Sequence, residues 1–354
     1  MRASTTVAFV GDLMLGRGVG AALSNGSSAR IWGDTLPILT SSAAVIANLE
    51  CPITSHDQEW RDGWKAFRFR ADARAIDALR AANVRAVNLA NNHILDFEER
   101  GLLQTLEHLD TAAIAHVGAG RDCEHAMRPA VLELPGLRLG LIGVTDNMPE
   151  FAASPRRPGT AYMSIRSDAA ALGVVRLLVQ ELRRAGAELV VLSVHWGPNL
   201  RIWPPARFRD FARQATELGV DVVHGHSAHL FQGVEIHNGA VILYDTGDFM
   251  NDYWIFPFVR TDRSFIFLLE LVQGRMRRLR LVPIRLEPAR VSLARGCEAA
   301  AIMRCMRRRC MALGTQPAPS AMGMEVAVDA ASNLSGPRWK FNEPADWALS
   351  AGYP

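Results

Sequence analysis

Lysine is nearly absent from this sequence of 354 residues, where it occurs only at Lys65 and Lys340. The remaining basic residues are arginines and the chain is rich in alanine, which indicates a compositional bias rather than selection for arginine chemistry. The sequence also lacks the glycine-rich loop with a lysine that cradles phosphate groups in many enzymes. Two common means of holding a phosphate group are therefore missing.

Long apolar runs and paired cysteines are missing as well. No apolar run approaches the ~18 residues that a membrane-spanning helix needs, and the N-terminus has too short an apolar segment for a signal peptide. The five cysteines are odd in number and scattered, which argues against a disulfide framework. We therefore expect a cytoplasmic protein with no membrane partner.

An excess of one charge sign is also lacking, because the formal net charge is only +3. Such a small charge gives no reason to expect a nucleic-acid partner. The hydrophobic content of 49% and the charged content of 21% are typical of an ordinary globular protein. A chain of this length can form one large domain or two modest ones.

Short apolar runs alternate with helical patterns along most of the chain. The runs are rich in β-branched and aliphatic residues, and they predict strands over 6–11, 43–50, 84–93, 137–144, 188–197, 220–226 and 239–249. A 3.6-residue periodicity predicts helices over 71–83, 97–112, 168–186 and 205–219. Because strands that are apolar throughout are covered on both faces, the sequence predicts an α/β fold with helices outside the sheets.

The pattern changes after Phe249. Residues 264–272 and 275–288 predict a hairpin that turns at Gln273 and Gly274, and residues 291–314 predict a helix. Residues 315–323 have the composition of a linker. We therefore divide the chain into a main domain over residues 1–290 and a C-terminal helix with an extended tail over residues 291–354, packed on that domain.

Polar residues collect at the ends of the predicted strands. Most of these residues follow directly on an apolar run, and they are Asp12, Glu50, Asn92, His93, Asp96, His195, His226, His229, Asp248 and Asp252. Any one of them has a structural explanation, since Asp12, for example, could cap a helix. In α/β sheets, however, ligands bind at the carboxyl ends of the strands. Carboxylates, an amide and imidazoles that meet at such an edge predict a metal site with acid/base groups beside it.

Six segments resemble the successive motifs of the CapA family of poly-γ-glutamate or capsule synthesis proteins. In chain order they read GDLMLGR, NLECPIT, NLANNHILDF, HWGPNLRIWPP, GHSAHLFQGVE and YDTGDFMNDY. The resemblance runs from about residue 6 to about residue 272 and is more specific for fold than for substrate. It implies the four-layer αββα sandwich of the calcineurin-like metallophosphoesterases, and it makes residues 1–290 the catalytic domain.

The resemblance also implies roles for individual residues. Asp12 resembles the first metal-binding aspartate, and Glu50 stands where a carboxylate would join the metals. The remaining metal ligands that it implies are Asn92, His195, His226 and His229. His93 resembles the acid/base histidine of the family, and the spacing G-H-x-x-H at residues 225–229 departs from the G-H-x-H of the phosphoesterases.

Met14 stands where the phosphoesterases place a histidine in their D-x-H motif. A thioether is a poor ligand for a hard divalent cation, so one of the two metal positions lacks a ligand. We therefore expect one divalent metal ion. Calcium is slightly favoured because the loss of a ligand lowers the number of nitrogen contacts, and Mn, Fe or Zn are the alternatives.

A single metal between two acid/base groups suits the removal and return of a proton at a carbon next to a carbonyl. We expect His93 with Asp96 to form one such group, and His229 or His226 with Asp248 or Asp252 to form the other, beside Asp12. Peptide epimerases of lasso-peptide pathways share the metallophosphoesterase-like fold, so the sequence predicts a metal-dependent epimerase of a precursor-peptide C-terminus. The expected substrate-binding residues are Trp60, Trp64, Arg68, Trp196, Asn199, Arg201 and Asp252.

Two other functions stay open. The first is a metal-dependent hydrolase of phosphoesters or of a poly-γ-glutamate or capsule-type polymer, against which we count the missing membrane anchor. The second is a non-catalytic binding protein that keeps the metal for stability. The oligomeric state and the role of residues 291–354 do not follow from the sequence.

Overall fold

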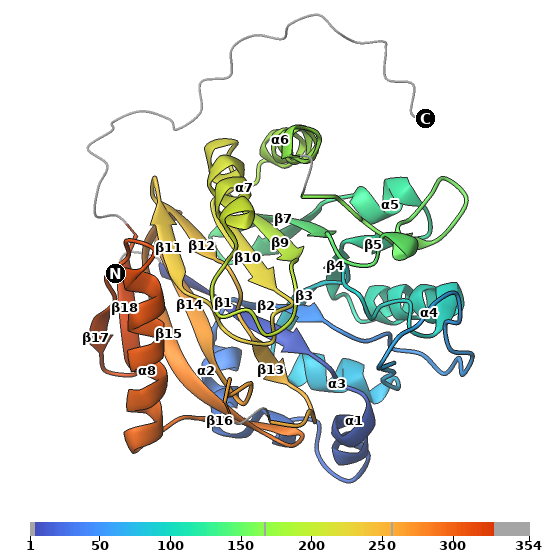
Figure 1. Ribbon diagram of the computed structural model, residues 1–354, viewed down its shortest axis with the longest axis horizontal. Helices are drawn as coiled ribbons and strands as arrows, with labels where there is room; N and C mark the ends of the chain where they lie inside the picture. Colours follow the sequence, from blue (N-terminus) through green and yellow to red (C-terminus); the bar gives the residue numbers. More distant parts are fainter. Residues whose placement is uncertain (1–3, 166–167, 256–257, 329–354) are drawn as a thin grey trace, which may run out of the picture.

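The computed structural model describes residues 4–165, 168–255 and 258–328, and these residues form two β-sheets with helices around them (Figure 1). The helices are α1 (Arg17–Ser24), α2 (Leu36–Ser41), α3 (Arg74–Ala81), α4 (Glu98–Thr111), α5 (Cys123–Met127), α6 (Asp168–Arg184), α7 (Ala206–Glu217) and α8 (Gly296–Met311), with short 3₁₀ turns η1 (Arg30–Thr35) and η2 (Pro149–Phe151). The prediction of an α/β class is confirmed.

The larger sheet has ten strands. Its main path runs in the order β17 (Ala318–Ser320), β18 (Gly323–Ala327), β15 (Arg275–Glu287), β14 (Arg263–Val272), β1 (Ser4–Leu13), β2 (Ala44–Leu49), β3 (Val84–Asn88) and β4 (Ala115–Val117). Two strands lie off this path: β13 (Asp248–Met250) pairs with β1, and β16 (Arg290–Leu293) pairs with β15. Strands β1 to β4 are parallel, so their carboxyl ends meet at one edge.

The smaller sheet has six strands in the order β11 (Val234–His237), β12 (Ala240–Leu243), β10 (Val222–His226), β9 (Leu189–His195), β7 (Leu137–Thr145) and β6 (Ala130–Leu134). Its four inner strands are parallel, and the two edge strands are antiparallel to their neighbours. A separate pair joins β5 (Ala119–Gly120) to β8 (Gly159–Thr160).

The buried apolar residues form three clusters that define the layers. One cluster fills the space between the sheets and includes Phe9 and Phe267 from the larger sheet and Val191 from the smaller one. A second lies on the outer side of the larger sheet under α1, α3 and α4, and a third lies on the outer side of the smaller sheet under α6 and α7. The order is therefore helices, sheet, sheet, helices.

The C-terminal segment shares the core between the sheets. Ile302 and Met306 of α8 belong to the cluster between the sheets, and so do Met324 and Val326 of β18. Residues 329–354, including Trp339 and Trp347, lie outside the described residues. No helix of the described part is long and apolar enough to cross a membrane.

Several predicted boundaries are wrong for local reasons. The strand predicted over 239–249 is two strands, because Gly247, with a φ of 66°, turns the chain from β12 in the smaller sheet to β13 in the larger. The strand predicted over 84–93 ends at Asn88, whose side chain bonds to the backbone of Ala90. The helix predicted over 291–314 starts only at Gly296, after β16, and the predicted linker over 315–323 contains β17.

Candidate metal centre

The carboxyl ends of strands from both sheets meet at one site. Asp12, the last residue but one of β1, is in register with Asn48 of β2 and with Asp248 of β13. In the other sheet, His195 at the end of β9 is in register with His226 at the end of β10. The apolar strands that precede these residues fix their backbone positions, so side chains far apart in sequence converge.

One set of candidate ligands consists of Asp12, His195 and His226. Their ligand atoms all lie within 4.8 Å of one another, and the Nδ1 atoms of the two histidines are 3.0 Å apart. All three side chains are buried. Burial holds the pKa of both histidines well below the usual value, so each ring is neutral and has a lone pair for a cation.

A second set consists of Asp12, Glu50, His229 and Asp248, and it satisfies the same 4.8 Å limit. His229 Nδ1 lies 2.8 Å from an Asp248 oxygen and 3.8 Å from Asp12 Oδ2. Asn251 donates a hydrogen bond of 2.7 Å to the other Asp248 oxygen. Because Asp12 belongs to both sets, they share one carboxylate and form a single continuous centre.

Among the buried oxygen atoms of this region, four that belong to predicted metal ligands have no hydrogen-bond partner among the described residues. They are Asp12 Oδ2, both carboxylate oxygens of Glu50, and the side-chain oxygen of Asn92. A buried acceptor without a partner costs about 1–3 kcal/mol, and more when it is charged. A cation that accepts these lone pairs would remove that cost, so the donor set fits a bound divalent metal ion.

The electrostatics point the same way. Burial, together with the neighbouring Glu50 and Asp248, raises the pKa of Asp12 well above its usual value, and burial raises the pKa of Glu50 to about 7. For His229, burial lowers the pKa, but Asp248, Glu50 and Asp12 outweigh it, so the net pKa is well above the usual value. The centre therefore holds more negative charge than its own residues neutralise.

An amide network that the sequence did not predict orients Asp12. Asn48 donates a hydrogen bond of 2.8 Å to Asp12 Oδ1, which leaves Oδ2 available to a cation. The oxygen of Asn48 accepts in turn from Asn88 at 3.0 Å and from Asn91 at 3.2 Å. The only sequence signal was the presence of asparagine inside otherwise apolar strands.

His93 and Asp96 form the predicted pair, and Lys65 joins them. His93 Nδ1 lies 2.6 Å from Asp96 Oδ2, which also accepts from the backbone N–H of Phe69 at 2.7 Å. The Lys65 ammonium bonds to the other Asp96 oxygen and to the Asn92 carbonyl. Sequence reasoning missed Lys65, although one of only two lysines in the chain, directly after Trp64, was a signal.

Aromatic side chains line one side of this pair. The ring of Phe69 lies 4.2 Å from that of His93 and stacks at 5.4 Å on Tyr253, whose ring meets His229 edge-on at 5.7 Å. The Tyr253 hydroxyl is buried and has no hydrogen-bond partner among the described residues. Tyr253 was not predicted as a site residue, yet its hydroxyl is an available donor beside the centre.

The predicted substrate-binding residues are dispersed. Trp60 and Trp196 are buried in apolar clusters, where the indole of Trp196 stacks on Phe208 and donates to the Tyr244 carbonyl. Trp196 is therefore part of the core beside α7 and does not present its ring to a ligand. Arg68 bonds to the carbonyl of Trp60 at 3.1 Å.

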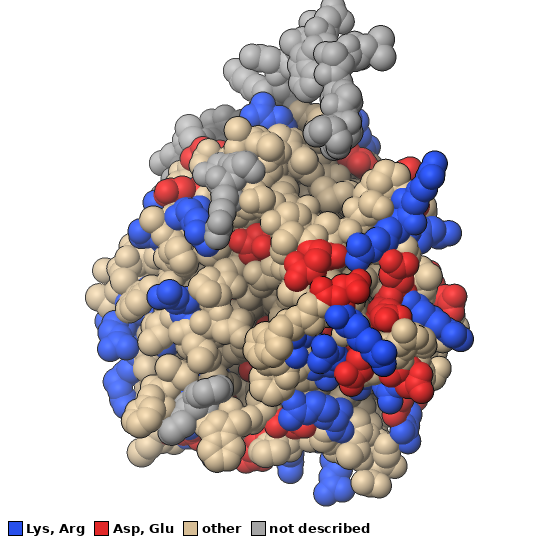
Figure 2. All heavy atoms as spheres, turned by 45° about the vertical axis from the view of Figure 1, so that its right-hand side comes forward, with Lys and Arg blue, Asp and Glu red and all other residues tan. Residues whose placement is uncertain are grey.

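The other predicted substrate residues lie nearer the surface. Trp64 is 89% exposed, and Asn199 and Arg201 are exposed. Asp252 instead forms an ion pair with Arg17 at 3.3 Å and accepts from the Gly18 N–H at 2.9 Å. On the side of the molecule drawn in Figure 2, charged side chains of both signs gather toward one edge, whereas the middle is mostly uncharged.

Met14 directly follows the last residue of β1. Its side chain is fully buried in the cluster outside the larger sheet, and its sulfur accepts a hydrogen bond of 3.3 Å from the Gly16 N–H. The thioether thus acts as a packing group that closes the turn after β1.

Comparison with known proteins gives the family. The profile of the bacterial capsule synthesis protein family PGA_cap matches residues 6–253. The chain belongs to this family. A probable polyglutamine synthesis accessory protein of Mycobacterium tuberculosis is 30% identical over 332 residues, which cover 82% of this chain and 87% of that protein.

Two CapA proteins are similar over four-fifths of the chain. The capsule biosynthesis protein CapA of Bacillus anthracis is 26% identical and is covered to 67%, and the PGA biosynthesis protein CapA of Bacillus subtilis is 27% identical and is covered to 72%. Among solved structures, TT1561 of Thermus thermophilus aligns over 77% of this chain and 100% of its own, with 11% identity and a TM-score of 0.40. That score is too low to support an argument.

The prediction of a lasso-peptide epimerase is wrong. The relatives are named for capsule, PGA or polyglutamine synthesis, and none of these three is named for epimerisation. The names agree instead with the capsule- or polyglutamate-type polymer of the alternative. We had counted the predicted lack of a membrane anchor against a role in capsule or polyglutamate synthesis. Similarity to such proteins over four-fifths of the chain outweighs that argument.

Proposed function

We propose that this protein is a metal-dependent hydrolase that acts in the synthesis of a capsule-type or polyglutamate-type polymer, where it cleaves an amide or phosphoester bond. The observation that carries this proposal is the set of unpartnered, buried oxygens of Asp12, Glu50 and Asn92 beside neutral histidines. The names of the relatives supply the polymer class. The calcineurin-like sandwich implied by the motifs agrees with two facing sheets covered by helices.

The metal would be held by Asp12 with His195 and His226 on one side, and with Glu50, His229 and Asp248 on the other. Two imidazoles in the first set favour Mn, Fe or Zn over Ca, which prefers oxygen ligands alone. Because Asp12 belongs to both ligand sets, its carboxylate could bind two ions, one in each set, whereas the sequence predicted a single ion. When bound, such an ion polarises the scissile group and makes a nucleophile of water at neutral pH.

The protein's own residues would supply proton transfer. Asp96 accepts from His93 Nδ1 and so fixes the tautomer in which Nε2 has the lone pair. Burial lowers the pKa of His93 to about 4 against the opposing effect of Asp96, so the ring is neutral at pH 7. Nε2 is then the atom that takes a proton and returns it to the leaving group.

The test is a comparison of two substrates and three forms of the protein. Purified protein is loaded with Mn²⁺ or Zn²⁺ and assayed on poly-γ-glutamate, for new amino termini, and on bis(p-nitrophenyl) phosphate, for released nitrophenol. We expect the protein to hydrolyse one of these two substrates. The rate should fall to background when a chelator is added, and it should fall at least about 100-fold in His93→Ala. His237→Gln, at a partly exposed histidine that ends β11, is the matched control and should retain full activity.

Two results would contradict the proposal. Tight metal binding without turnover of either substrate would instead indicate a binding protein that keeps the ion for stability. Turnover that persists in the presence of a chelator and in His93→Ala would show that this centre does not catalyse the reaction.

A further inference from the structure

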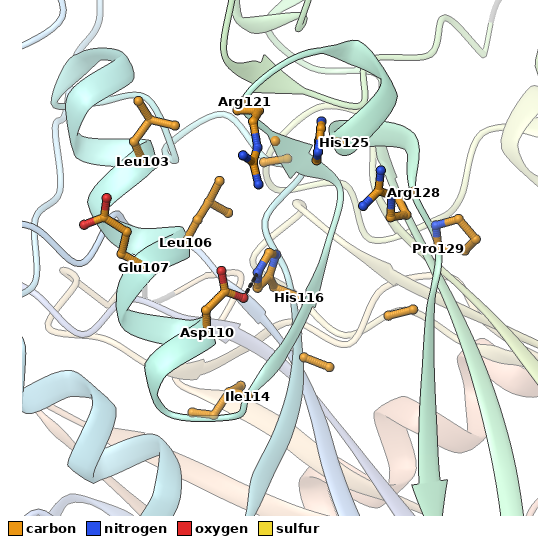
Figure 3. A pocket seen from close by; sticks show the side chains of 14 residues that line it. Leu103, Leu106, Glu107, Asp110, Ile114, His116, Arg121, His125, Arg128 and Pro129 are labelled. Carbon is orange, nitrogen blue, oxygen red and sulfur yellow. Dashed lines mark hydrogen bonds and ion pairs between the residues drawn. The ribbon is translucent and has the colours of Figure 1, made fainter.

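One cavity lies away from the metal centre. It has a volume of about 530 Å³ and lies between the C-terminal half of α4 and the segment that runs from β4 through α5 to β6 (Figure 3). Ligand sites in proteins usually measure about 300–1,000 Å³. None of the residues that line it belongs to either candidate ligand set, so the cavity is separate from the metal centre.

The walls of this cavity are held in place by the fold. Asp122 caps α5 by accepting from the His125 N–H at 2.9 Å, and the Cys123 N–H donates to the Ser154 carbonyl at 3.1 Å. A side chain on Gly120 would fall 2.3 Å from the backbone nitrogen of Ala126, so β5 and α5 are in close contact. The basic wall is therefore preformed rather than assembled by a ligand.

Charges of opposite sign occupy opposite walls. Glu107 and Asp110 project from α4, whereas Arg121, His125 and Arg128 project from the α5 side, as Figure 3 shows. Three of these groups already have partners, since His116 pairs with Asp110 at 3.0 Å, His125 with Asp122 at 2.8 Å, and Arg128 with Glu124 at 3.3 Å.

Two charges have no ion pair among the described residues: Glu107 on the acidic wall and Arg121 on the basic wall. Both side chains are exposed, and each is available to a ligand. Between them the cavity is lined by the half-buried Leu103 and Leu106 and the buried Ile114. Acidic, apolar and basic side chains therefore line the same cavity.

We propose that this cavity binds a short linear zwitterion with an apolar middle, of which a dipeptide with two free ends is the simplest. The ammonium end would lie against Glu107 and Asp110, and the carboxylate end would accept a charge-assisted hydrogen bond from Arg121. The apolar side chains of the ligand would cover Leu103, Leu106 and Ile114. A ligand with only a negative charge would be repelled by Glu107 and Asp110. The lining therefore favours a ligand that carries both a positive and a negative charge. This binding is independent of the reaction proposed for the metal centre.

The experiment is isothermal titration calorimetry of the full chain with three probes. These are the dipeptide Leu-Leu, its N-acetyl form, which lacks the ammonium, and its C-terminal amide, which lacks the carboxylate. We expect Leu-Leu to bind, and each blocked form to bind at least about tenfold more weakly, because each loses one charge-assisted contact.

The variants assign each end of the probe to a wall. Arg121→Gln should weaken Leu-Leu binding about tenfold and abolish the preference for a free carboxylate, whereas Glu107→Gln should abolish the preference for a free ammonium. Arg100→Gln, exposed on the same helix α4, and Glu181→Gln, exposed on α6, do not line the cavity and should bind as the parent does.

Three results would overturn the proposal. Leu-Leu that does not bind at millimolar concentration would show that the cavity does not take this class of ligand. N-acetyl-Leu-Leu that binds as tightly as Leu-Leu would show a simple anion site. Unchanged binding in both Arg121→Gln and Glu107→Gln would place the probe elsewhere on the molecule.

Discussion

The imidazole Nε2 of His224, on β10, donates a hydrogen bond of 2.9 Å to the backbone carbonyl of Val10, on β1. This bond joins the two sheets, since β10 belongs to the smaller and β1 to the larger. Val10 lies two residues before Asp12, and His224 lies two residues before His226. The bond therefore fixes the position of β10 relative to β1, and with it the position of His226 relative to Asp12.

This relationship predicts a pH dependence of stability. Burial lowers the pKa of His224 to about 4, against a usual value of 6.5. Between pH 6.5 and 4 the unfolded chain then binds a proton that the folded chain does not, so stability falls as the pH is lowered through this window. When the pH falls below both pKa values, this one histidine lowers the free energy of unfolding by about 3 kcal/mol relative to neutral pH.

The measurement is urea unfolding of the metal-free protein at pH 7.5 and pH 5. His195 and His226, also buried with lowered pKa values, contribute in the same direction. His224→Gln should therefore be less stable at pH 7.5 but lose less stability on going to pH 5, whereas His237→Gln should behave as the parent does. An equal pH dependence in His224→Gln and the parent would contradict this account.

Asp12→Asn should have opposite effects with and without metal. Without metal, burial, Glu50 and Asp248 all disfavour the ionised form of Asp12, and asparagine cannot ionise, so the variant should melt at or above the Tm of the parent in a chelator. With Mn²⁺ at 100 times Kd, the parent gains about 2.7 kcal/mol, and the variant should gain much less because both ligand sets lose Asp12. Thermal unfolding in both buffers, with metal content measured by elemental analysis, tests this. Equal metal-induced stabilisation of the two proteins would exclude Asp12 as a ligand.

Lys65→Met should destabilise the fold and leave metal content unchanged. The Lys65 ammonium and Asp96 form an ion pair whose side chains are 8% and 0% exposed, and removal of one partner from such a pair typically costs about 3–5 kcal/mol. Asp96 would then hold His93 less firmly, so hydrolysis should fall as well. Arg61→Gln, at an exposed basic residue of the same loop, is the control and should change stability by less than about 0.5 kcal/mol. A Lys65→Met protein as stable as the control would show that the pair contributes nothing.

The sequence predicted the metal centre better than it predicted the residues that support it. Asp12, Glu50, His195, His226 and His229 converge because each lies at or shortly after the carboxyl end of a strand, and parallel strands end at a common edge. Asn48 and His224 were missed because they lie inside strands, where a single polar residue does not reveal which face it occupies. Lys65 was missed because its loop has no regular period, and its place depends on tertiary contacts alone.

The split of residues 239–249 has a similar cause. The first half is apolar, but residues 245–249 read D-T-G-D-F, and the turn at Gly247 in this polar stretch separates β12 from β13. The backbone carbonyl of Gly247 accepts from the Asp12 N–H at 3.0 Å, which docks β13 against β1. Because that contact is between residues that lie near opposite ends of the matched segment, no local pattern could have indicated it.

Helix α8 offers a test of whether the C-terminal segment belongs to the main core. Met306 is fully buried among residues of both sheets, whereas Met311, on the same helix, is 52% exposed. Met306→Ala should lower the free energy of unfolding by about 2–5 kcal/mol, because it removes buried methylenes and leaves a cavity. Met311→Ala makes the same chemical change at the surface and should cost less than about 0.5 kcal/mol. Urea unfolding followed by both tryptophan fluorescence and far-UV circular dichroism should show one coincident transition for each variant. If Met306→Ala instead separates the two probes into two transitions, α8 unfolds on its own and the segment after residue 290 is a separate unit.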